Sequence, residues 1–589
     1  MSKQTIKINV PVLTRVEGEG ALDLTIKNQQ ITELKLRIFE PPRYFEKFLQ
    51  GRNYYDVPDT VARICGICPV AYQMSAAHAI ESVFKVKTTP WIRAMRRLFY
   101  CGEWLQSHSL HIHLLAAPDF LGFNSVLEMS EQYADEVRRG LKLQALGNDL
   151  VALFGARSVH PVGVKIGGFY KAPEQRAVDN LLQRIKDAKQ DAIELIKWLD
   201  TLDLADDEQD FISVALHHES EYPFNEGRLI SDHGLDIAIS DFDKHFKEQH
   251  VDHSTALHCL LDNKPYLVGP LARVNLNYAQ FPHDVKALMS QLKTSFPSKN
   301  MFHSIIARGL EIYFCILEAE SLLENYQFTN QPAVEFTTTE GTGFGCTEAP
   351  RGFLWHRFDM DKNGCVTRAV IVPPTSQNQP RIEEDLRNSL IRFGLDQEKQ
   401  KLQLHAEKVI RNYDPCISCA THFLNVNLTR DHQKVDTDNI CTIPKFNNLH
   451  LAKTAIIGIG SPQPNDNTGW LAIEKLSTHP EIITLKKHGL HLLKLDRPGI
   501  QLKQILINYA HVIIIDAVVP QQTDNNMSWF TLNELSPDST IFTSHQLGVA
   551  ESLQYINQFE TLPDDIAILA IANMDETLLY QNILQCLNI

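Results

Sequence analysis

Alternating apolar and polar residues predict that the chain begins with β-strands. Residues 5–38 alternate in this way, and glycines at positions 18 and 20 mark a turn. Apolar side chains then recur at helical spacing within residues 91–153, 173–203 and 301–326. Residues 353–373 alternate again around a turn at 361–364, which predicts a hairpin. The first 430 residues are therefore predicted to form a helix-rich α+β domain.

The pattern changes near the end of the chain. A polar, irregular stretch predicts a linker, and after it short apolar runs at 455–460, 511–516 and 567–572 alternate with helical stretches at 468–476 and 547–559. Such alternation predicts an α/β domain, in which a parallel sheet is covered by helices on both faces. We therefore divide the chain into a first domain of residues 1–430, a linker of 431–452 and a second domain of 453–589.

Composition narrows the classes of protein that fit. The chain has 589 residues, of which 44% are hydrophobic and 22% charged, as in ordinary globular proteins. A formal charge of −15 argues against nucleic-acid binding. No apolar run approaches the roughly 20 residues of a membrane span, and the N-terminus lacks an apolar signal core. Eleven cysteines without a disulfide-like pattern suit a reducing compartment. We expect a cytoplasmic protein that is not integral to a membrane.

Two cysteine pairs are candidate metal ligands. Cys65 and Cys68 lie within 61–84, a predicted helix, and Cys416 and Cys419 follow Asp414-Pro, which fits a helix start. Residues three apart share a helix face, and four thiolates would form a soft-metal site. Structural zinc and disulfides are the alternatives. The pairs of a zinc ribbon usually lie roughly 15–20 residues apart, however, and here most of the first domain separates them.

These two motifs, RxCGxC and DPCxxCxxH, resemble the signature motifs of nickel–iron hydrogenase large subunits, and the resemblance covers the first 430 residues. It implies the helix-rich fold of that family and the reversible oxidation of H2 to protons and electrons. It also implies that Cys65 and Cys416 bind nickel terminally. Cys68 and Cys419 would bridge the nickel to an iron that holds carbon monoxide and cyanide.

The same resemblance implies roles around the metals. Glu17, in an RVEG motif, would carry protons away, and Arg351, in an EAPRG motif within the predicted glycine-rich loop 341–352, would lie over the metals. Either Arg351 or the Cys416 thiolate would act as the base that takes a proton from hydrogen. Pro350 and Asp414 would complete the canopy above the metals. From the residues alone, Glu17 is as readily a solvated turn carboxylate and Arg351 a surface arginine.

Further residues match the family's outer positions. Ser376 would hydrogen-bond the cyanide ligands, and Glu46 and His422 would bind a magnesium ion. Magnesium prefers oxygen donors and keeps several waters, so one carboxylate and one imidazole are sufficient protein ligands. On residue type alone, a surface helix charge is the favoured interpretation of Glu46. Many relatives have histidine where this chain has Tyr72, which changes the hydrogen bonding available next to Cys68.

Electrons released at such a site need an exit. Beyond the four paired cysteines the chain shows no cysteine set for iron–sulfur clusters, so an iron–sulfur small subunit is expected as a partner. Soluble members of the family pass electrons onward to NAD(P)- or flavin-dependent subunits. Two alternatives stay open. One is a hydrogen-sensing regulatory subunit with low turnover. The other is a redox-inert scaffold like the related subunit of respiratory complex I, which lacks the four thiols.

The second domain resembles hydrogenase maturation endopeptidases through the stretches Gly458-Ile-Gly-Ser-Pro, Asp466-Asn-Thr-Gly and Ser544-His-Gln-Leu-Gly. The resemblance implies that Asp466, Asp516 and His545 bind the nickel of an immature large subunit and that the chain is cut between His422 and Phe423. A vestigial or purely docking domain is the alternative. Dinucleotide binding is disfavoured, because glutamine replaces the third glycine of GxGxxG.

Overall fold

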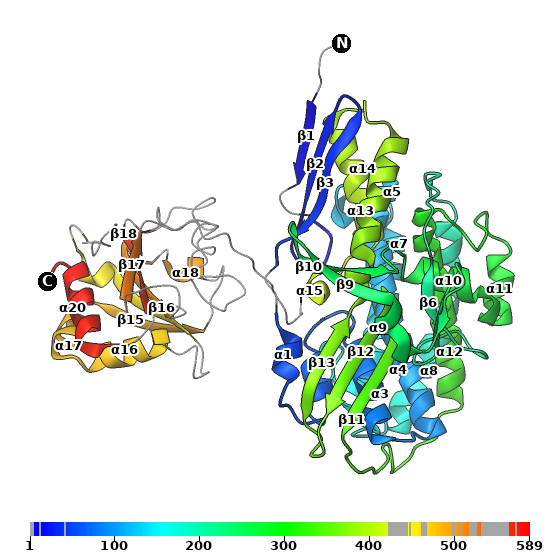
Figure 1. Cartoon of the computed structure of the whole chain (residues 1–589), viewed down its shortest axis with the longest axis horizontal. Coiled ribbons are helices and arrows are strands. Elements are labelled where there is room, and N and C mark those ends of the chain that lie inside the picture. Colours follow the sequence, from blue (N-terminus) through cyan, green and yellow to red (C-terminus); the bar gives the residue numbers. More distant parts are fainter. Residues whose placement is uncertain are drawn as a thin grey trace. The chain divides into compact units, whose positions relative to one another are not determined.

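The computed structural model describes residues 5–10, 13–40, 43–421, 446, 449–460, 468–496, 502–506, 508–517, 527–531, 563, 565–571 and 574–589. The chain divides into two compact units, Met1–Asn427 and Leu428–Ile589 (Figure 1). The predicted linker lies mostly outside the described residues, and its limits stay a prediction. Among the described helices, none is long and apolar enough to cross a membrane.

The first unit begins with the predicted strands, which form an antiparallel sheet in the order β1-β2-β3. Their bounds are β1 Thr5–Val10, β2 Gly20–Lys27 and β3 Gln30–Ile38. The apolar face of this sheet shares a core with helices α13 Pro374–Phe393 and α14 Lys399–Asn412. The N-terminal sheet is thereby joined to residues that lie more than three hundred positions later in the chain.

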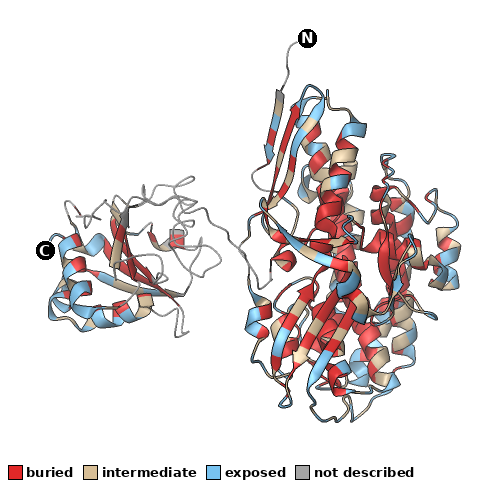
Figure 2. Ribbon diagram, in the orientation of Figure 1, coloured by how far each residue is buried: buried red, intermediate tan, exposed pale blue. Residues whose placement is uncertain are grey.

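Long helices form the larger core of the first unit, as their apolar periodicity predicts. They are α3 Pro69–Phe84, α4 Pro90–Leu110, α7 Ala134–Gly155, α8 Gln175–Leu199 and α12 Ser304–Glu324. Figure 2 shows the buried residues in red. Helices α4 and α7 approach so closely that a Cβ added at Gly147 would lie 2.6 Å from the carbonyl oxygen of Gly102. Glycine is therefore needed at that crossing.

A three-stranded antiparallel sheet packs against α3. It consists of β11 Gly341–Ala349, β12 Gly352–Met360 and β13 Val366–Val372. The predicted hairpin is confirmed, but the prediction of a glycine-rich loop at 341–352 is wrong, because most of this segment is β11. A Cβ at Gly343 or Gly345 would lie 2.0 Å from the carbonyl oxygen of Ala79 or Ser75. These glycines let the strand touch the backbone of α3.

Shorter elements complete the first unit. The helical segments are α1 Phe45–Leu49, α2 Val57–Val61, the π-helical turn η1 His111–Ala116, α5 Ala117–Leu121, α6 Val126–Ser130, η2 Ile239–Asp241, α9 Phe242–His245, α10 Pro270–Asn277, η3 Tyr278–Gln280, α11 His283–Met289, η4 Met301–His303 and α15 Ile417–Ala420. The strands are β4 Val164–Lys165, β5 Gly168–Phe169, β6 Val214–His217, β7 Arg228–Ser231, β8 Asp236–Ile237, β9 Phe246–Val251 and β10 Ser254–Leu261.

The described part of the second unit contains a five-stranded sheet in the order β15-β14-β16-β18-β17. Its strands are β14 Thr454–Gly460, β15 His491–Asp496, β16 His511–Ala517, β17 Met527–Thr531 and β18 Asp565–Ile571. All neighbours are parallel except β17, which runs antiparallel to β18. The helical segments are η5 Leu451–Lys453, α16 Thr468–Thr478, α17 Pro480–Lys487, α18 Leu502–Leu506 and α20 Glu576–Cys586.

Apolar residues gather on both faces of this sheet in two separate clusters. Such two-sided burial is typical of a parallel sheet in an α/β domain. The three predicted strands and the helix at 468–476 are confirmed. The helix predicted at 547–559 lies outside the described residues.

Candidate metal centre

The two cysteine pairs meet in the interior of the first unit. The Sγ atoms of Cys65 and Cys416 lie 3.4 Å apart, those of Cys68 and Cys419 3.9 Å, and those of Cys416 and Cys419 2.9 Å. All four sulfurs lie within 4.8 Å of one another, and the residues are at most 3% exposed. A disulfide would need a separation of about 2.05 Å. Sulfurs that share one tetrahedral metal lie about 3.8 Å apart. The distances between the two pairs, 3.4 and 3.9 Å, are close to this value, whereas Cys416 and Cys419 would move apart from 2.9 Å on binding a metal.

The first pair does not lie on a helix as the sequence pattern predicts, and of the second pair only Cys419 does. Helix α3 begins at Pro69, so Cys65 and Cys68 lie in the preceding turn, and Cys68 is the N-cap residue. The backbone N–H of Cys68 donates to the Cys65 sulfur (3.3 Å). Helix α15 begins at Ile417 with Cys416 as its N-cap, because Asp414 has a φ of 57° and leaves the helical region. Each pair therefore lies where a turn enters a helix, and there its sulfurs converge.

Two polar side chains, half-buried Arg43 and buried Glu103, hold these turns in place. The guanidinium of Arg43 donates to the carbonyl oxygens of both Ile64 and Ser418, which ties the first cysteine segment to the second. The carboxylate of Glu103 accepts hydrogen bonds from the N–H groups of Val70 (2.6 Å) and Ala71 (3.2 Å), at the start of α3. Neither role is visible in the sequence, because each contact joins residues far apart in the chain.

Glu17 reaches the second cysteine pair. The Cys416 thiol donates to Glu17 Oε2 at 3.1 Å, and the N–H of Ser418 donates to the same oxygen at 3.1 Å. Burial, together with charge on Cys65, raises the pKa of the Glu17 carboxyl, although these two hydrogen bonds oppose the shift. The side chain is half-buried, whereas the Cys416 sulfur is buried. A carboxyl in this position can exchange a proton with sulfur and pass it outward.

Arg351 follows Pro350 in the turn between β11 and β12. Its Nε donates to the backbone oxygen of Asp414 (2.7 Å), and one terminal nitrogen pairs with Asp414 Oδ1 (2.9 Å). Burial opposes its charge, but Asp414 and the cysteine sulfurs raise the pKa of the guanidinium well above its usual value. The other terminal nitrogen, Nη1, is buried without a hydrogen-bond partner among the described residues. Arg351 therefore keeps a donor for a further ligand.

That buried donor adjoins a small cavity. The cavity has a volume of about 20 Å³, and Arg351, Arg308 and Asn412 are among its lining residues. About 10–15 Å³ of such volume is needed to hold a water molecule, so one small molecule fits beside Arg351.

The first turn of α13 lies next to the cysteines. Thr375 Oγ1 accepts a hydrogen bond from the N–H of Cys416 (3.0 Å). The hydroxyl of Ser376 instead donates to Glu248 Oε1 (2.9 Å) and to the carbonyl oxygen of Pro373 (3.0 Å). The hydroxyl in contact with a cysteine segment therefore belongs to Thr375, the residue next to the one that the sequence singled out.

Two carboxylates lie close together behind this turn. Glu46 is buried, unlike a surface helix charge, and accepts a hydrogen bond from the N–H of Ile371 (2.8 Å). Burial raises the pKa of Glu248 to about 8, and the charge of Glu46 adds to the effect. Two carboxylates of this kind form a hard-cation environment.

Several predicted site residues cannot be located. His422 and Phe423 lie outside the described residues, as do Asp466 and His545. Asp516 is described at the end of β16 and is fully buried. Neighbouring β14 pairs with β16 up to Gly458 and Ile515, so Asp516 lies at the carboxyl edge of the sheet. Ligands bind at this edge in open α/β sheets.

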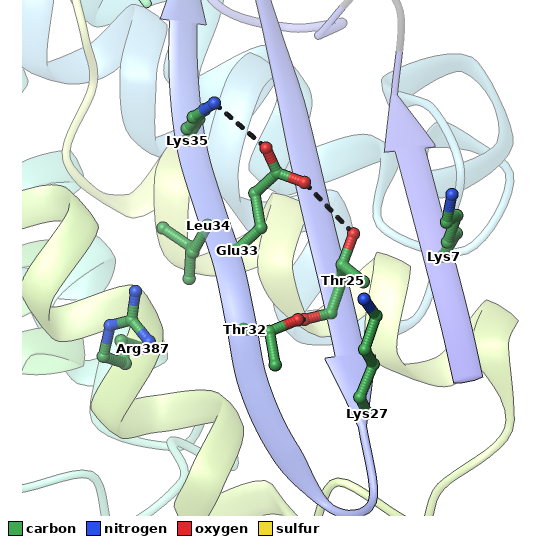
Figure 3. A pocket seen from close by; sticks show the side chains of 8 residues that line it. All are labelled: Lys7, Thr25, Lys27, Thr32, Glu33, Leu34, Lys35 and Arg387. Carbon is green, nitrogen blue, oxygen red and sulfur yellow. Dashed lines mark hydrogen bonds and ion pairs between the residues drawn. The ribbon is translucent and has the colours of Figure 1, made fainter. Parts of the chain in front are cut away.

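A surface groove lies away from the cysteines. It occupies about 530 Å³ on the β1–β3 sheet, where Glu33 contacts both Lys35 and Thr25 (Figure 3). Its basic lining residues are Lys7, Lys27, Lys35 and Arg387. Neither cysteine nor histidine is among the residues that line this groove, so it offers no soft metal ligand.

Comparisons with known proteins agree with this geometry. Residues 43–142 and 259–422 match the family model described as nickel-dependent hydrogenase. Sulfhydrogenase 1 subunit alpha of Pyrococcus furiosus is 30% identical over 434 residues, which cover 72% of this chain and 100% of that protein. The NAD-reducing hydrogenase HoxS subunit beta of Cupriavidus necator is 28% identical over 468 residues, with coverage of 71% and 95%.

A solved structure gives the same result. The crystal structure of an NAD+-reducing [NiFe]-hydrogenase in the H2-reduced state superposes with a TM-score of 0.65 and 25% identity, covering 72% of this chain and 100% of that chain. The matched family residues contain both cysteine pairs, which the fold brings into one buried pocket. The chain therefore belongs to the nickel-dependent hydrogenase family, and its first part has the large-subunit fold of that family.

Proposed function

We propose that this chain is the catalytic large subunit of a nickel–iron hydrogenase that oxidises H2 reversibly. The observation that carries the proposal is the buried set of four sulfurs within 4.8 Å, with Glu17 on one side and Arg351 close by. Soft thiolate donors suit nickel and iron. Cys65 and Cys416 would hold nickel terminally, and Cys68 and Cys419 would bridge it to an iron that bears carbon monoxide and cyanide. When bound, this metal pair supplies the site at which H2 is polarised and split.

The chain's own residues then handle the proton. The Cys416 sulfur is buried beside the sulfur of Cys419 (2.9 Å), and as a thiolate it would serve as the base that takes the proton. Glu17 lies 3.1 Å away and would accept the proton and carry it outward. Arg351 would orient the incoming molecule with its unpaired nitrogen while Asp414 fixes the rest of the guanidinium. Pro350 shapes the same turn.

A magnesium ion beside Glu46 is part of the proposal. The raised pKa of Glu248 next to Glu46 supports it, because a divalent cation would relieve the repulsion between two buried carboxylates. His422 is proposed as the second protein ligand. Ser376 would act here through Glu248, and Thr375 is the better candidate for contact with a ligand on the iron.

An iron–sulfur small subunit is the proposed partner. Large side chains exposed in the first unit include Phe48 (55%), Tyr55 (56%) and Val159 (51%). Val159 approaches Gly66, which lies between Cys65 and Cys68. An exposed apolar patch can mark an interaction surface, and we propose that the partner docks beside Val159, next to the first cysteine pair, where electrons would leave the metals. NAD(P)- or flavin-dependent subunits are proposed further along, as in the NAD-reducing relatives.

The test uses the chain co-purified with its partner from nickel-replete cells. We expect nickel and iron by elemental analysis, infrared bands of iron-bound carbon monoxide and cyanide, and sustained H2 uptake with an artificial electron acceptor. Intact metals with negligible turnover would support the hydrogen-sensing alternative. Zinc in place of nickel and iron, without these bands, would refute the hydrogenase proposal.

For the second unit we propose a fused maturation endopeptidase that cuts after His422. The parallel sheet and the buried Asp516 at its carboxyl edge support the proposal. Asp466 and His545 are the other proposed nickel ligands. The number of residues between the two units adds little entropy cost to cleavage within one chain, since closure entropy grows slowly with length. Domain limits of 1–430, 431–452 and 453–589 are part of the proposal.

Mass spectrometry of nickel-replete and nickel-depleted protein tests the cleavage. We expect a product ending at His422 only with nickel, and none from the Asp516→Asn variant. Full H2 turnover by an uncut chain would contradict the cleavage proposal and leave the hydrogenase proposal intact.

A further inference from the structure

A second group of metal-binding side chains lies outside the four-cysteine centre. His253 is in the turn between β9 and β10, His258 lies on β10, and Glu383 lies on α13. Each offers a ligand atom within 4.8 Å of the others. His253 Nε2 already lies 2.8 Å from Glu383 Oε1. Three separate segments of the fold thus bring two imidazoles and a carboxylate together.

The deepest member of this group has no partner for one ring nitrogen. His258 is 4% exposed, and its Nε2 is buried without a hydrogen-bond partner among the described residues. A buried polar atom left unpaired costs about 1–3 kcal/mol, so native structures usually satisfy it. Burial also lowers the pKa of His258 to about 4, and a neutral imidazole is the form that binds metals.

The carboxylate is held in orientation but its charge is not cancelled by a fixed cation. The N–H of Leu36 donates to Glu383 Oε1 (2.8 Å) from strand β3. Within the described part of the chain, no lysine or arginine pairs with Glu383, and His253 is its ion-pair partner. The third cluster of this type, His218 with Glu221 and Glu226, differs because Arg93 pairs with both of its carboxylates.

We propose that His253, His258 and Glu383 bind a divalent transition-metal ion, of which Zn²⁺ fits best, and that this ion fastens the β9–β10 hairpin to α13. Two imidazoles and one carboxylate are a common zinc set, with water in the fourth position. Two of the ligands are about one-fifth exposed, so water can reach the ion. The backbone donor on Glu383 supplies the outer orientation that metal ligands need.

The geometry requires a small adjustment. Nitrogen and oxygen ligands of one tetrahedral zinc lie about 3.3 Å apart, given bonds near 2.0–2.2 Å. The ion would therefore replace the proton between His253 and Glu383 and widen their separation from 2.8 Å. His258 would turn its unpaired nitrogen to the same point.

The site would reinforce a connection to the cysteine centre. Glu248 on β9 accepts a hydrogen bond from Ser376 in the first turn of α13, and Glu383 lies seven residues later on the same helix. Residues seven apart share a helix face. The β9–β10 hairpin would then be bonded to α13 at two points. Thr375, in the first turn of α13, accepts the hydrogen bond from the Cys416 N–H. The ion is thus a positioning element with no direct part in catalysis.

The experiment measures zinc bound per chain in the protein co-purified with its partner from nickel-replete cells. Wild type and the variants His253→Gln, His258→Gln and Glu383→Gln are dialysed against ZnCl2, desalted and analysed by elemental analysis. His283→Gln is the matched control, since its side chain is 93% exposed and belongs to no cluster among the described residues. We expect wild type and the control to hold one more zinc ion per chain than the three variants.

The result is the difference in bound zinc between wild type and each variant, so zinc bound at other sites does not affect it. X-ray absorption at the zinc edge should show nitrogen and oxygen neighbours for the additional ion, and zinc should raise the melting temperature of wild type and control only. Equal zinc in all five proteins, or sulfur neighbours around the additional ion, overturns the proposal. If the buried His258→Gln variant fails to fold, the two partly exposed positions decide, provided that their nickel content equals that of wild type.

Discussion

Replacing Glu17 by glutamine isolates its ability to hold a proton. The amide oxygen of glutamine still accepts the hydrogen bond from the Ser418 N–H (3.1 Å in the native protein), so the fold around the cysteines should persist. The proton passed from Cys416, also at 3.1 Å, loses its acceptor. Positioned acid–base groups contribute about 10²–10⁴ in rate. We therefore expect H2 uptake to fall by about two to four orders of magnitude.

A second substitution tests distance. Aspartate keeps the carboxyl but is one methylene shorter, about 1.5 Å. The gap from Cys416 to oxygen would grow to about 4.6 Å, beyond hydrogen-bond reach, so Glu17→Asp should lose most of the activity although it can still titrate.

The assay compares H2 uptake, using an artificial electron acceptor, with nickel and iron content. Glu19→Gln is the control, since Glu19 is an exposed carboxylate two residues along the same segment. Metal content should stay unchanged in all variants. Activity of Glu17→Gln within a factor of two of wild type would refute the assignment of Glu17 as the relay.

Three further predictions concern Arg351, the crossing of α4 and α7, and the buried His113. Arg351→Lys should retain charge but lose the paired contact with Asp414, so H2 turnover should fall about 10-fold or more at unchanged metal content, which elemental analysis and uptake rates would check. Gly147→Ala should destabilise the first unit by about 1–3 kcal/mol through its clash with α4, seen as a lower urea midpoint; an unchanged midpoint would contradict the close packing. Burial lowers the pKa of His113 to about 4. The free energy of unfolding is therefore highest above about pH 6.5, where His113 is neutral in the folded and unfolded states. It should fall by up to about 1.4 kcal/mol per pH unit as the pH decreases toward 4. Urea midpoints between pH 7 and 5 should therefore fall less steeply for His113→Gln than for wild type, whereas the exposed His283→Gln should follow wild type.

The sequence predicted the N-terminal strands, the long helices and the hairpin of the first unit, because their apolar periodicity is a local signal. The four cysteines were also predictable, since each pair has short spacing and a distinctive motif. The helix starts were predicted wrongly at both pairs. Cys68 and Cys416 are N-cap residues, and the sequence pattern does not show that their turns are held from outside by Glu103 and Arg351.

Errors elsewhere have the same cause. The glycines of 341–352 predicted a loop, but they serve the contact between β11 and α3, which depends on tertiary packing. Thr375 was not identified from the sequence, because neighbouring hydroxyls on a helix point in different directions and only the fold decides which one faces Cys416; the role of Ser376 stays a prediction. Arg43 gave no signal at all, since its two carbonyl partners come from separate segments.

The bond network of Arg43 has a consequence for biosynthesis. Each sulfur pair is joined to its counterpart across 351 positions of sequence, and Arg43 bridges the same two segments. A nascent chain on the ribosome that has exposed only its first cysteines can offer two thiols and no enclosed pocket. Insertion of the metals must therefore wait until translation has passed residue 419, and truncation anywhere before that point should leave a chain that cannot retain nickel.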